Sequence, residues 1–256
     1  MKPDKDRFKA ACEAVIGSSD ESSGKSDRAR QGIGTLGEKT LHAVLKNYYE
    51  SDKSCHEVKL GSFYADIAKN GKVTEIQTGS FNKLCRKLDF FLISHEVTVV
   101  YPIAAVKYIC WIDPETGALV SRKKSPKKGS VCDSLKELYY IREFLGDPNL
   151  KIRLVMLEVD EYKLLDGYGK DKKSRATKYE RVPLDIIEEI ELSDKRDYMM
   201  LLPAELESPF TAKDFMKASK FSSKASYAAI RLLLTLGIIS PTESKNRAAA
   251  YEPAEY

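Results

Sequence analysis

The sequence predicts a mixed α/β domain over residues 32–195, followed by a small helix-turn-helix domain over residues 196–256. Segments with the apolar spacing of helices alternate with short runs rich in β-branched and aromatic residues, which is typical of a sheet covered by helices. The C-terminal part instead holds two helical segments joined by a tight turn. A hydrophobic content of 43% in 256 residues is sufficient for one sizeable domain with a real core and a second, smaller one.

The composition of the chain limits the classes of protein to which it can belong. The net charge is only +4, from 42 basic and 38 acidic residues, so a surface that binds polyanions must come from local clustering. The five cysteines are scattered singly, which indicates a reducing compartment and no zinc cluster. No apolar run approaches the roughly 20 residues that span a bilayer, and the N-terminus lacks the apolar stretch of a signal peptide. We therefore expect a cytoplasmic protein with no membrane partner.

The N-terminal part of the chain is predicted to be a flexible segment over residues 1–31. Residues 17–31 are polar and rich in Gly and Ser, so they cannot bury apolar area, and any helix before them is short. Apolar side chains then recur at helical spacing over residues 35–49, with Glu38 in the first turn of this helix. Residues 32–37 satisfy Gly-x-Gly-x-x-Gly, but no strand precedes them, so we expect no nucleotide cofactor.

The next strands are joined by the dipeptide Asn70-Gly71, which favours a two-residue type I′ turn. A turn there places Asp66 directly opposite Glu75, with Cβ atoms about 4.5 to 5.5 Å apart. Like charges at that distance destabilise a sheet unless something compensates them, and a divalent cation is the natural compensator. Gln77 lies on the same face as Glu75 because side chains alternate along a strand. The alternative is a surface hairpin whose two acids only face water.

The rest of the α/β domain follows in order. Ser80 is the expected N-cap of a second helix, which carries Lys83 and Lys87 on the face opposite its apolar stripe. Beyond this helix we expect strands over residues 97–102 and 104–112, a return strand after the turn at 113–117, a helix over 134–145, a strand over 152–159, and a connector or lobe over 160–194.

The C-terminal domain has clear helix boundaries. Thr211 is expected to cap a helix that runs to Ala218, and Ser222 or Ser223 caps a longer helix that Gly237 ends. The chain that follows is expected to form a hairpin. This layout is that of a winged helix, and a helical protein-interaction module is the alternative.

Basic side chains mark the surfaces of the C-terminal domain that are expected to contact DNA. Lys224, Tyr227 and Arg231 recur at helical spacing on the second helix and form its expected exposed edge. Lys245 and Arg247 lie near the tip of the hairpin. Phosphate contacts are favoured over base reading.

The α/β domain resembles the PD-(D/E)xK nuclease superfamily, the restriction-endonuclease-like fold of many restriction enzymes and Holliday-junction resolvases. The resemblance covers roughly residues 33–112 and rests on a helix bearing Glu38, a strand bearing Asp66, and a strand bearing Glu75 and Gln77 before the next helix. It implies that Asp66 and Glu75 hold Mg²⁺ (or Mn²⁺), with Glu38 assisting as a third carboxylate. It also implies hydrolysis of phosphodiester bonds in DNA, and a homodimer as the assembly to test.

Position 77 departs from the motif of the superfamily. Gln77 stands where Lys is usual, and an amide has no charge with which to stabilise hydroxide or the phosphorane. Three interpretations remain open. Lys83 or Lys87 supplies the cation, or Gln77 only orients the water as in some restriction enzymes of this fold, or catalysis is lost and the chain is a DNA-binding regulator. RNA is a further substrate to consider. His42, one helical turn after Glu38, is either structural or part of the same pocket.

The resemblance suggests a role for one basic cluster of the α/β domain. We call it the basic run, and it consists of Arg122, Lys123, Lys124, Lys127 and Lys128. Such a cluster is usually only a solvated loop. Beside a site that cleaves phosphodiesters it is a candidate phosphate clamp, because affinity for nucleic acid comes largely from phosphate contacts.

Overall fold

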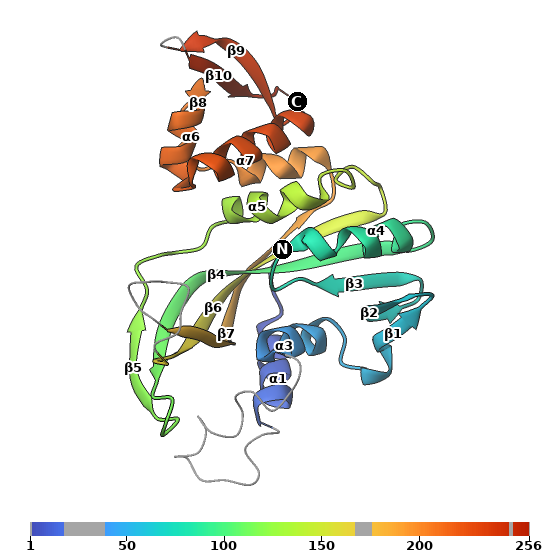
Figure 1. Cartoon of the computed structure of the whole chain (residues 1–256). Coiled ribbons are helices and arrows are strands. Elements are labelled where there is room, and N and C mark those ends of the chain that lie inside the picture. The colour runs from blue at the N-terminus through green and yellow to red at the C-terminus, as the bar shows by residue number, and fades with distance from the viewer. Residues whose placement is uncertain (1, 18–38, 167–175, 246–247, 256) are drawn as a thin grey trace. The chain divides into compact units, whose positions relative to one another are not determined.

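The computed structural model (Figure 1) describes residues 2–17, 39–166, 176–245 and 248–255. The protein is a mixed α/β structure with a large mixed sheet flanked by helices, as the sequence predicts, and with a second, three-stranded sheet. The chain divides into two compact units that alternate along the sequence. Unit 1 contains Met1–Lys69, Ala104–Gly129 and Val155–Glu189, and unit 2 contains Asn70–Ile103, Ser130–Leu154 and Ile190–Tyr256.

The large sheet has seven strands in the order β1-β2-β3-β4-β6-β7, with β5 paired to β4. Strands β1 and β2 are antiparallel, β3 and β4 are parallel, and β4 and β5 are antiparallel, which makes the sheet mixed. The strands are β1 (His56–Leu60), β2 (Phe63–Lys69), β3 (Lys72–Ile76), β4 (Glu96–Ile112), β5 (Leu119–Lys124), β6 (Leu150–Leu164) and β7 (Thr177–Leu192).

Two of the predicted boundaries in this sheet are wrong. The expected strands over residues 97–102 and 104–112 form one strand, β4, because Pro102 removes a single hydrogen-bond donor and the extended backbone continues through it. The expected connector over residues 160–194 instead contains the end of β6 and all of β7. Its charged residues suggested a loop, but Ile186 and Ile190 are buried among them.

The described part of unit 1 includes the helices α1 (Lys5–Ile16) and α3 (Thr40–Tyr49), which pack against each other. The flexible segment predicted over residues 1–31 is therefore too long. Phe8 is buried and its ring meets that of Tyr48 edge to face at 5.5 Å, a contact between segments that the sequence pattern could not link. Residues 18–31 lie outside the described part of the chain.

The helices of unit 2 within residues 70–154 are short. Ser80 caps η3 (Phe81–Lys83), as predicted, and α4 (Cys85–Phe91) follows, with its apolar stripe buried. The helix predicted over residues 134–145 is instead three short turns. They are η4 (Val131–Ser134), α5 (Leu135–Leu138) and η5 (Tyr139–Ile141).

The C-terminal part of unit 2 has the predicted elements. Thr211 caps α6 through a capping box, Ser222 caps α7, and Gly237 follows α7 with a φ of 70°. A three-stranded antiparallel sheet of order β8-β10-β9 completes this part. The elements are η6 (Lys195–Leu201), β8 (Phe210–Thr211), α6 (Ala212–Ser219), α7 (Ser223–Thr235), β9 (Ile239–Lys245) and β10 (Ala248–Pro253).

Helix α7 packs against α5 within unit 2. Phe221 lies in the turn that precedes α7, and the Lys136 ammonium of α5 lies 3.9 Å from the centre of its ring.

All five cysteines are free thiols. In the ranges that the structure describes, no helix combines the length and the apolar character needed to cross a membrane.

Candidate functional site

The turn between β2 and β3 has the predicted form. Strand β2 ends at Lys69 and β3 begins at Lys72, so only Asn70 and Gly71 separate them. Both residues have positive φ, 51° and 73°, which is the conformation that a type I′ turn requires. The predicted two-residue turn is confirmed. The opposition of two carboxylates that it implies stays a prediction.

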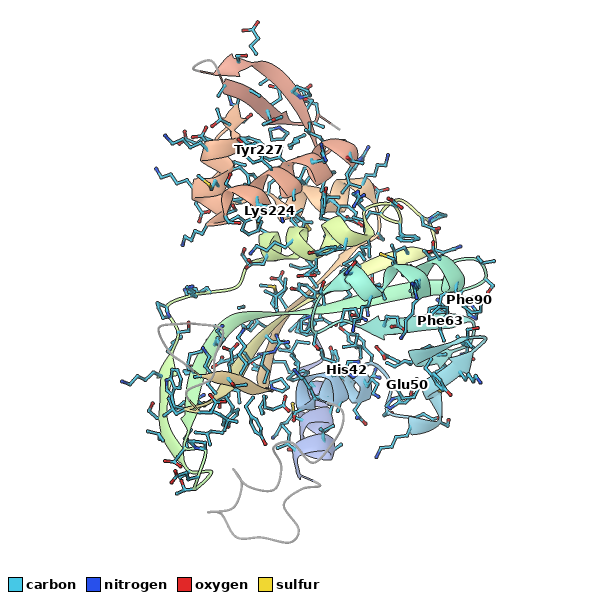
Figure 2. The ribbon with its side chains drawn as sticks, viewed as in Figure 1. His42, Glu50, Phe63, Phe90, Lys224 and Tyr227 are labelled. Carbon is cyan, nitrogen blue, oxygen red and sulfur yellow. The ribbon has the colours of Figure 1, made fainter. Side chains whose placement is uncertain are left out.

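In unit 1, Asp66 of β2 is buried, with 8% of its surface exposed. The Nε2 atom of His42 on α3 lies 3.2 Å from its Oδ2 atom. Figure 2 labels His42 on this helix. The structure therefore brings His42 to Asp66, which favours the second of the two roles considered for this histidine.

A second polar side chain of α3 lies one turn beyond His42. Lys46 is buried and donates a 2.6 Å hydrogen bond to the Glu57 carboxylate of β1. Residues four apart share one face of a helix, so Lys46 lies on the same face of α3 as His42. Helix α3 begins at Thr40, with Lys39 as its N-cap, so the predicted start of this helix near residue 35 is wrong. The spacing of four residues from His42 is the signal in the sequence from which a role for Lys46 could have been predicted. Glu38 itself lies outside the described residues.

In unit 2, Glu75 of β3 has no exposed surface. The Lys87 ammonium of α4 donates to both of its carboxylate oxygens, at 3.0 Å and 2.8 Å. A carboxylate loses its hydration when it is buried, so it needs a cation and hydrogen bonds of this kind. Lys83, the other lysine considered, is exposed and belongs to no ion pair among the residues described.

The crossover between β3 and β4 explains how Lys87 reaches Glu75. These strands are parallel neighbours, with Glu75 paired to Val99, so the chain between them must return along the sheet through a helix. That helix is α4, which carries Lys87. Gln77 continues the parallel pairing beyond β3, since its N–H donates to the Val100 carbonyl at 2.9 Å.

The burial of both acids corrects the simplest alternative. A surface hairpin would leave Asp66 and Glu75 in water, whereas 8% and 0% of their surfaces are exposed. Each acid instead has a partner that is cationic or can become so, from a helix in its own unit. Over the residues described, no group of three or more His, Cys, Asp or Glu side chains has the arrangement of a metal site.

The basic run begins on β5, which carries Arg122, Lys123 and Lys124, and continues beyond the end of this strand with Lys127 and Lys128. The Arg122 guanidinium donates to both Asp160 oxygens, at 2.9 Å and 3.2 Å, and its Cζ atom lies 3.8 Å from the centre of the Tyr108 ring. A hydrogen bond to Glu158 raises the pKa of the Tyr108 hydroxyl. The four lysines of the run are exposed.

On α7, the three side chains predicted to form an exposed edge are exposed. Lys224, Tyr227 and Arg231 are all exposed, and Tyr227 has 62% of its surface exposed. Figure 2 labels Lys224 and Tyr227 in this part of the chain. The opposite face, which includes Ile230 and Leu233, is buried. The side chain of Lys245 and the whole of Arg247, near the tip of the hairpin, lie outside what the structure describes. The glycine motif at residues 32–37 also lies outside the described residues.

These features define a mixed α/β protein with two buried, partnered carboxylates on adjacent strands, and with two helices and a three-stranded sheet in its C-terminal part. Residues 39–193 match the family described as "Domain of unknown function (DUF8091)", and because this match covers more than half of the chain, the protein belongs to that family. A relative from Treponema pallidum (strain Nichols), named "Uncharacterized protein", is 27% identical over 220 residues, which is 86% of each chain. No solved structure matches the chain.

Proposed function

We propose that the protein is a Mg²⁺-dependent endonuclease that hydrolyses phosphodiester bonds in DNA, with Asp66 and Glu75 as metal ligands. The observation that carries this proposal is the position of Lys87. Its ammonium lies within 3.0 Å of both oxygens of the buried Glu75. Lys87, on the helix that follows β3, thus supplies beside Glu75 the positive charge that the Gln77 amide lacks.

The donor chemistry of the two acids suits the metal. Mg²⁺ in proteins is bound through one or two carboxylates and keeps several waters. The two-residue turn at Asn70 and Gly71 supports a register in which Asp66 faces Glu75. Bound Mg²⁺ would polarise a phosphoryl oxygen and lower the pKa of a water molecule.

The side chains around the acids have distinct proposed roles. Lys87 stabilises the negative charge that develops on the phosphoryl oxygens, which is the role that a fixed cation in a poorly hydrated site performs best. His42 holds the Asp66 carboxylate in one orientation through their 3.2 Å contact and is a positioning residue. The Gln77 amide hydrogen-bonds the attacking water.

The C-terminal part is proposed to be a winged helix that grips the duplex. Its support is the order of β8, α6, α7 and the β9–β10 hairpin, together with the exposed edge of α7. Lys224 and Arg231 are suited to phosphate contacts, and a helix of this kind enters the major groove.

A second candidate is a catalytically inactive DNA-binding regulator with the same fold. It is favoured by Gln77 and by the pair between Lys87 and Glu75, since the ammonium neutralises a carboxylate that the metal needs. The variant Gln77→Lys separates the two candidates. A gain of cleavage in this variant indicates an impaired native site.

The test of the proposed function is cleavage of supercoiled, linear and branched DNA in Mg²⁺, with RNA of matching sequence in parallel. Asp66→Asn and Glu75→Gln keep the shape of each side chain and remove its charge. Because a metal supplies several kcal/mol of transition-state stabilisation, each variant is expected to lose roughly 100-fold or more in rate. Unchanged cleavage by both purified variants rules the site out.

A further inference from the structure

The basic run lies at an edge of the large sheet in unit 1. Strand β5 pairs with β4 and lies off the main path of the sheet. The antiparallel register places Arg122 opposite Cys110 and Lys124 opposite Tyr108. The basic side chains therefore begin on a regular strand.

The chain beyond β5 is also held in place by its backbone. The Ser125 N–H donates to the Lys107 carbonyl at 2.8 Å, and the Gly129 N–H donates to the Ala104 carbonyl at 3.0 Å. Both carbonyls belong to β4. The lysines between these two bonds are thus carried on a fixed backbone, which argues against the solvated loop considered from the sequence.

The cations in this region are of two kinds, and the first kind is structural. Arg122 pairs with Asp160, and the ammonium groups of Lys107 and Lys163 lie 3.4 Å and 3.6 Å from the Glu161 carboxylate. Both acids are buried. These three cations compensate buried charges and are not available for a ligand.

The second kind is uncompensated. Lys123, Lys127 and Lys128 are exposed and pair with no acid in the part of the chain that the structure describes, and the Lys124 ammonium lies 5.9 Å from the Tyr108 ring. Residues 119–129 contain five basic residues and no acidic residue. Like charges held close together repel each other, and such a surface attracts a polyanion.

We propose that these four lysines, named here the lysine clamp, bind the phosphate backbone of nucleic acid without reading its sequence. The choice of partner rests on the proposed function, but binding by the clamp requires no cleavage. An ammonium acts as a point charge on a phosphate, so the clamp adds affinity rather than specificity.

Two other uses of the same lysines predict different results. Lysines on an edge strand prevent pairing with another chain, so their loss would cause self-association. Leu119 and Val120 are exposed beside the clamp, and apolar residues next to basic ones also suit an anionic membrane surface.

The experiment compares two variants of the full chain with equal net charge. The clamp variant carries Gln at positions 123, 124, 127 and 128. The control variant carries Gln in place of four other exposed lysines, Lys2, Lys9, Lys59 and Lys195, so the net charge falls from +4 to zero in both. Fluorescence anisotropy with a labelled DNA duplex in EDTA gives the affinity over a series of salt concentrations.

Each lysine that contacts a phosphate contributes about 0.9 to the slope of log K against log salt concentration, so full engagement of the clamp contributes about 3.6. A decrease of about 2 or more in the clamp variant, with the control unchanged, supports the proposal. A smaller decrease, or an equal decrease in the control, overturns it. Parallel titrations with single-stranded RNA identify which nucleic acid the clamp prefers.

Further readouts separate the alternatives. Self-association of the clamp variant in sedimentation, with an unchanged DNA slope, overturns the proposal in favour of edge protection. Lysine-dependent binding of the wild type to phosphatidylserine vesicles but not to DNA overturns it in favour of a membrane. Since binding is measured without metal, a wild type that binds through the clamp but never cleaves contradicts only the proposed function. Cleavage with an unchanged slope contradicts only the clamp.

Discussion

Replacing Lys87 by Met is expected to destabilise the fold strongly. The substitution keeps the length and the apolar stem of the side chain but removes the ammonium from a carboxylate with no exposed surface. Removing one partner of a buried ion pair costs about 3 to 5 kcal/mol. The Lys87 side chain is 26% exposed, and the remaining solvent lowers this expectation to about 2 to 4 kcal/mol. For a chain of this size, the melting temperature then falls by roughly 5 to 15 °C.

A double-mutant cycle isolates this interaction from other effects of the substitution. Thermal and urea unfolding are measured for Lys87→Met, Glu75→Gln and the double variant. Because Glu75 is the charge that loses its ammonium partner in Lys87→Met, the double variant is expected to be more stable than Lys87→Met alone. Lys83→Met is the matched control, since Lys83 lies just before α4 but is exposed, and it is expected to change stability by less than about 0.5 kcal/mol.

If Lys87→Met unfolds at the same temperature as the wild type, or if the two single effects simply add, the ion pair does not stabilise the fold. The same variant also bears on catalysis. Addition of Mg²⁺ is expected to restore part of its stability, because the metal replaces the lost positive charge beside Glu75, while cleavage remains absent. Restored cleavage in this folded variant contradicts the catalytic role proposed for Lys87.

Three further outcomes are expected. Burial, together with a hydrogen bond to Glu189, raises the pKa of Tyr48 to about 12. The stability that depends on its neutral phenol is therefore complete below the normal tyrosine pKa of about 10 and is lost as the pH rises through 12. Urea unfolding of Tyr48→Phe is expected to show a smaller loss of stability over that range, and equal losses contradict this. Burial raises the pKa values of Cys12 and Cys110 to about 11 and that of Cys132 to about 12, so a thiol reagent at pH 8 should modify Cys55 and Cys85 first, and equal rates for all five would contradict the burial. Arg231→Gln should reduce the salt slope of DNA binding by about 0.9, and an unchanged slope excludes α7 from the interface.

The parts of the fold that the sequence predicts correctly are those set by neighbouring residues. Asn70 and Gly71 demand positive φ, and Thr211 satisfies free N–H groups at the start of α6, so both features depend on local chemistry. The errors fall where distant segments decide the outcome. Residues 5–16 form the ordered helix α1 because they pack against α3, and the charge-rich sequence of β7 forms a strand because it pairs with β6.

The same distinction between features set by neighbouring residues and features set by packing applies to the candidate site. The spacing of Asp66 and Glu75 about the turn is legible in one sequence, whereas the choice between Lys83 and Lys87 is not. A continuous helix would place these lysines on one face. The 3-10 turn η3 ends at Lys83 and α4 begins at Cys85, and the change in residues per turn alters their relative direction. Of these two lysines, Lys87 is the one that contacts Glu75.

The most direct test of the account is the position of Mn²⁺ in crystals soaked at a concentration that supports cleavage in solution. We expect one anomalous scattering peak about 2.0 to 2.2 Å from a carboxylate oxygen of Asp66 and from one of Glu75. Protein that nicks plasmid while its bound Mn²⁺ contacts neither carboxylate would contradict the account.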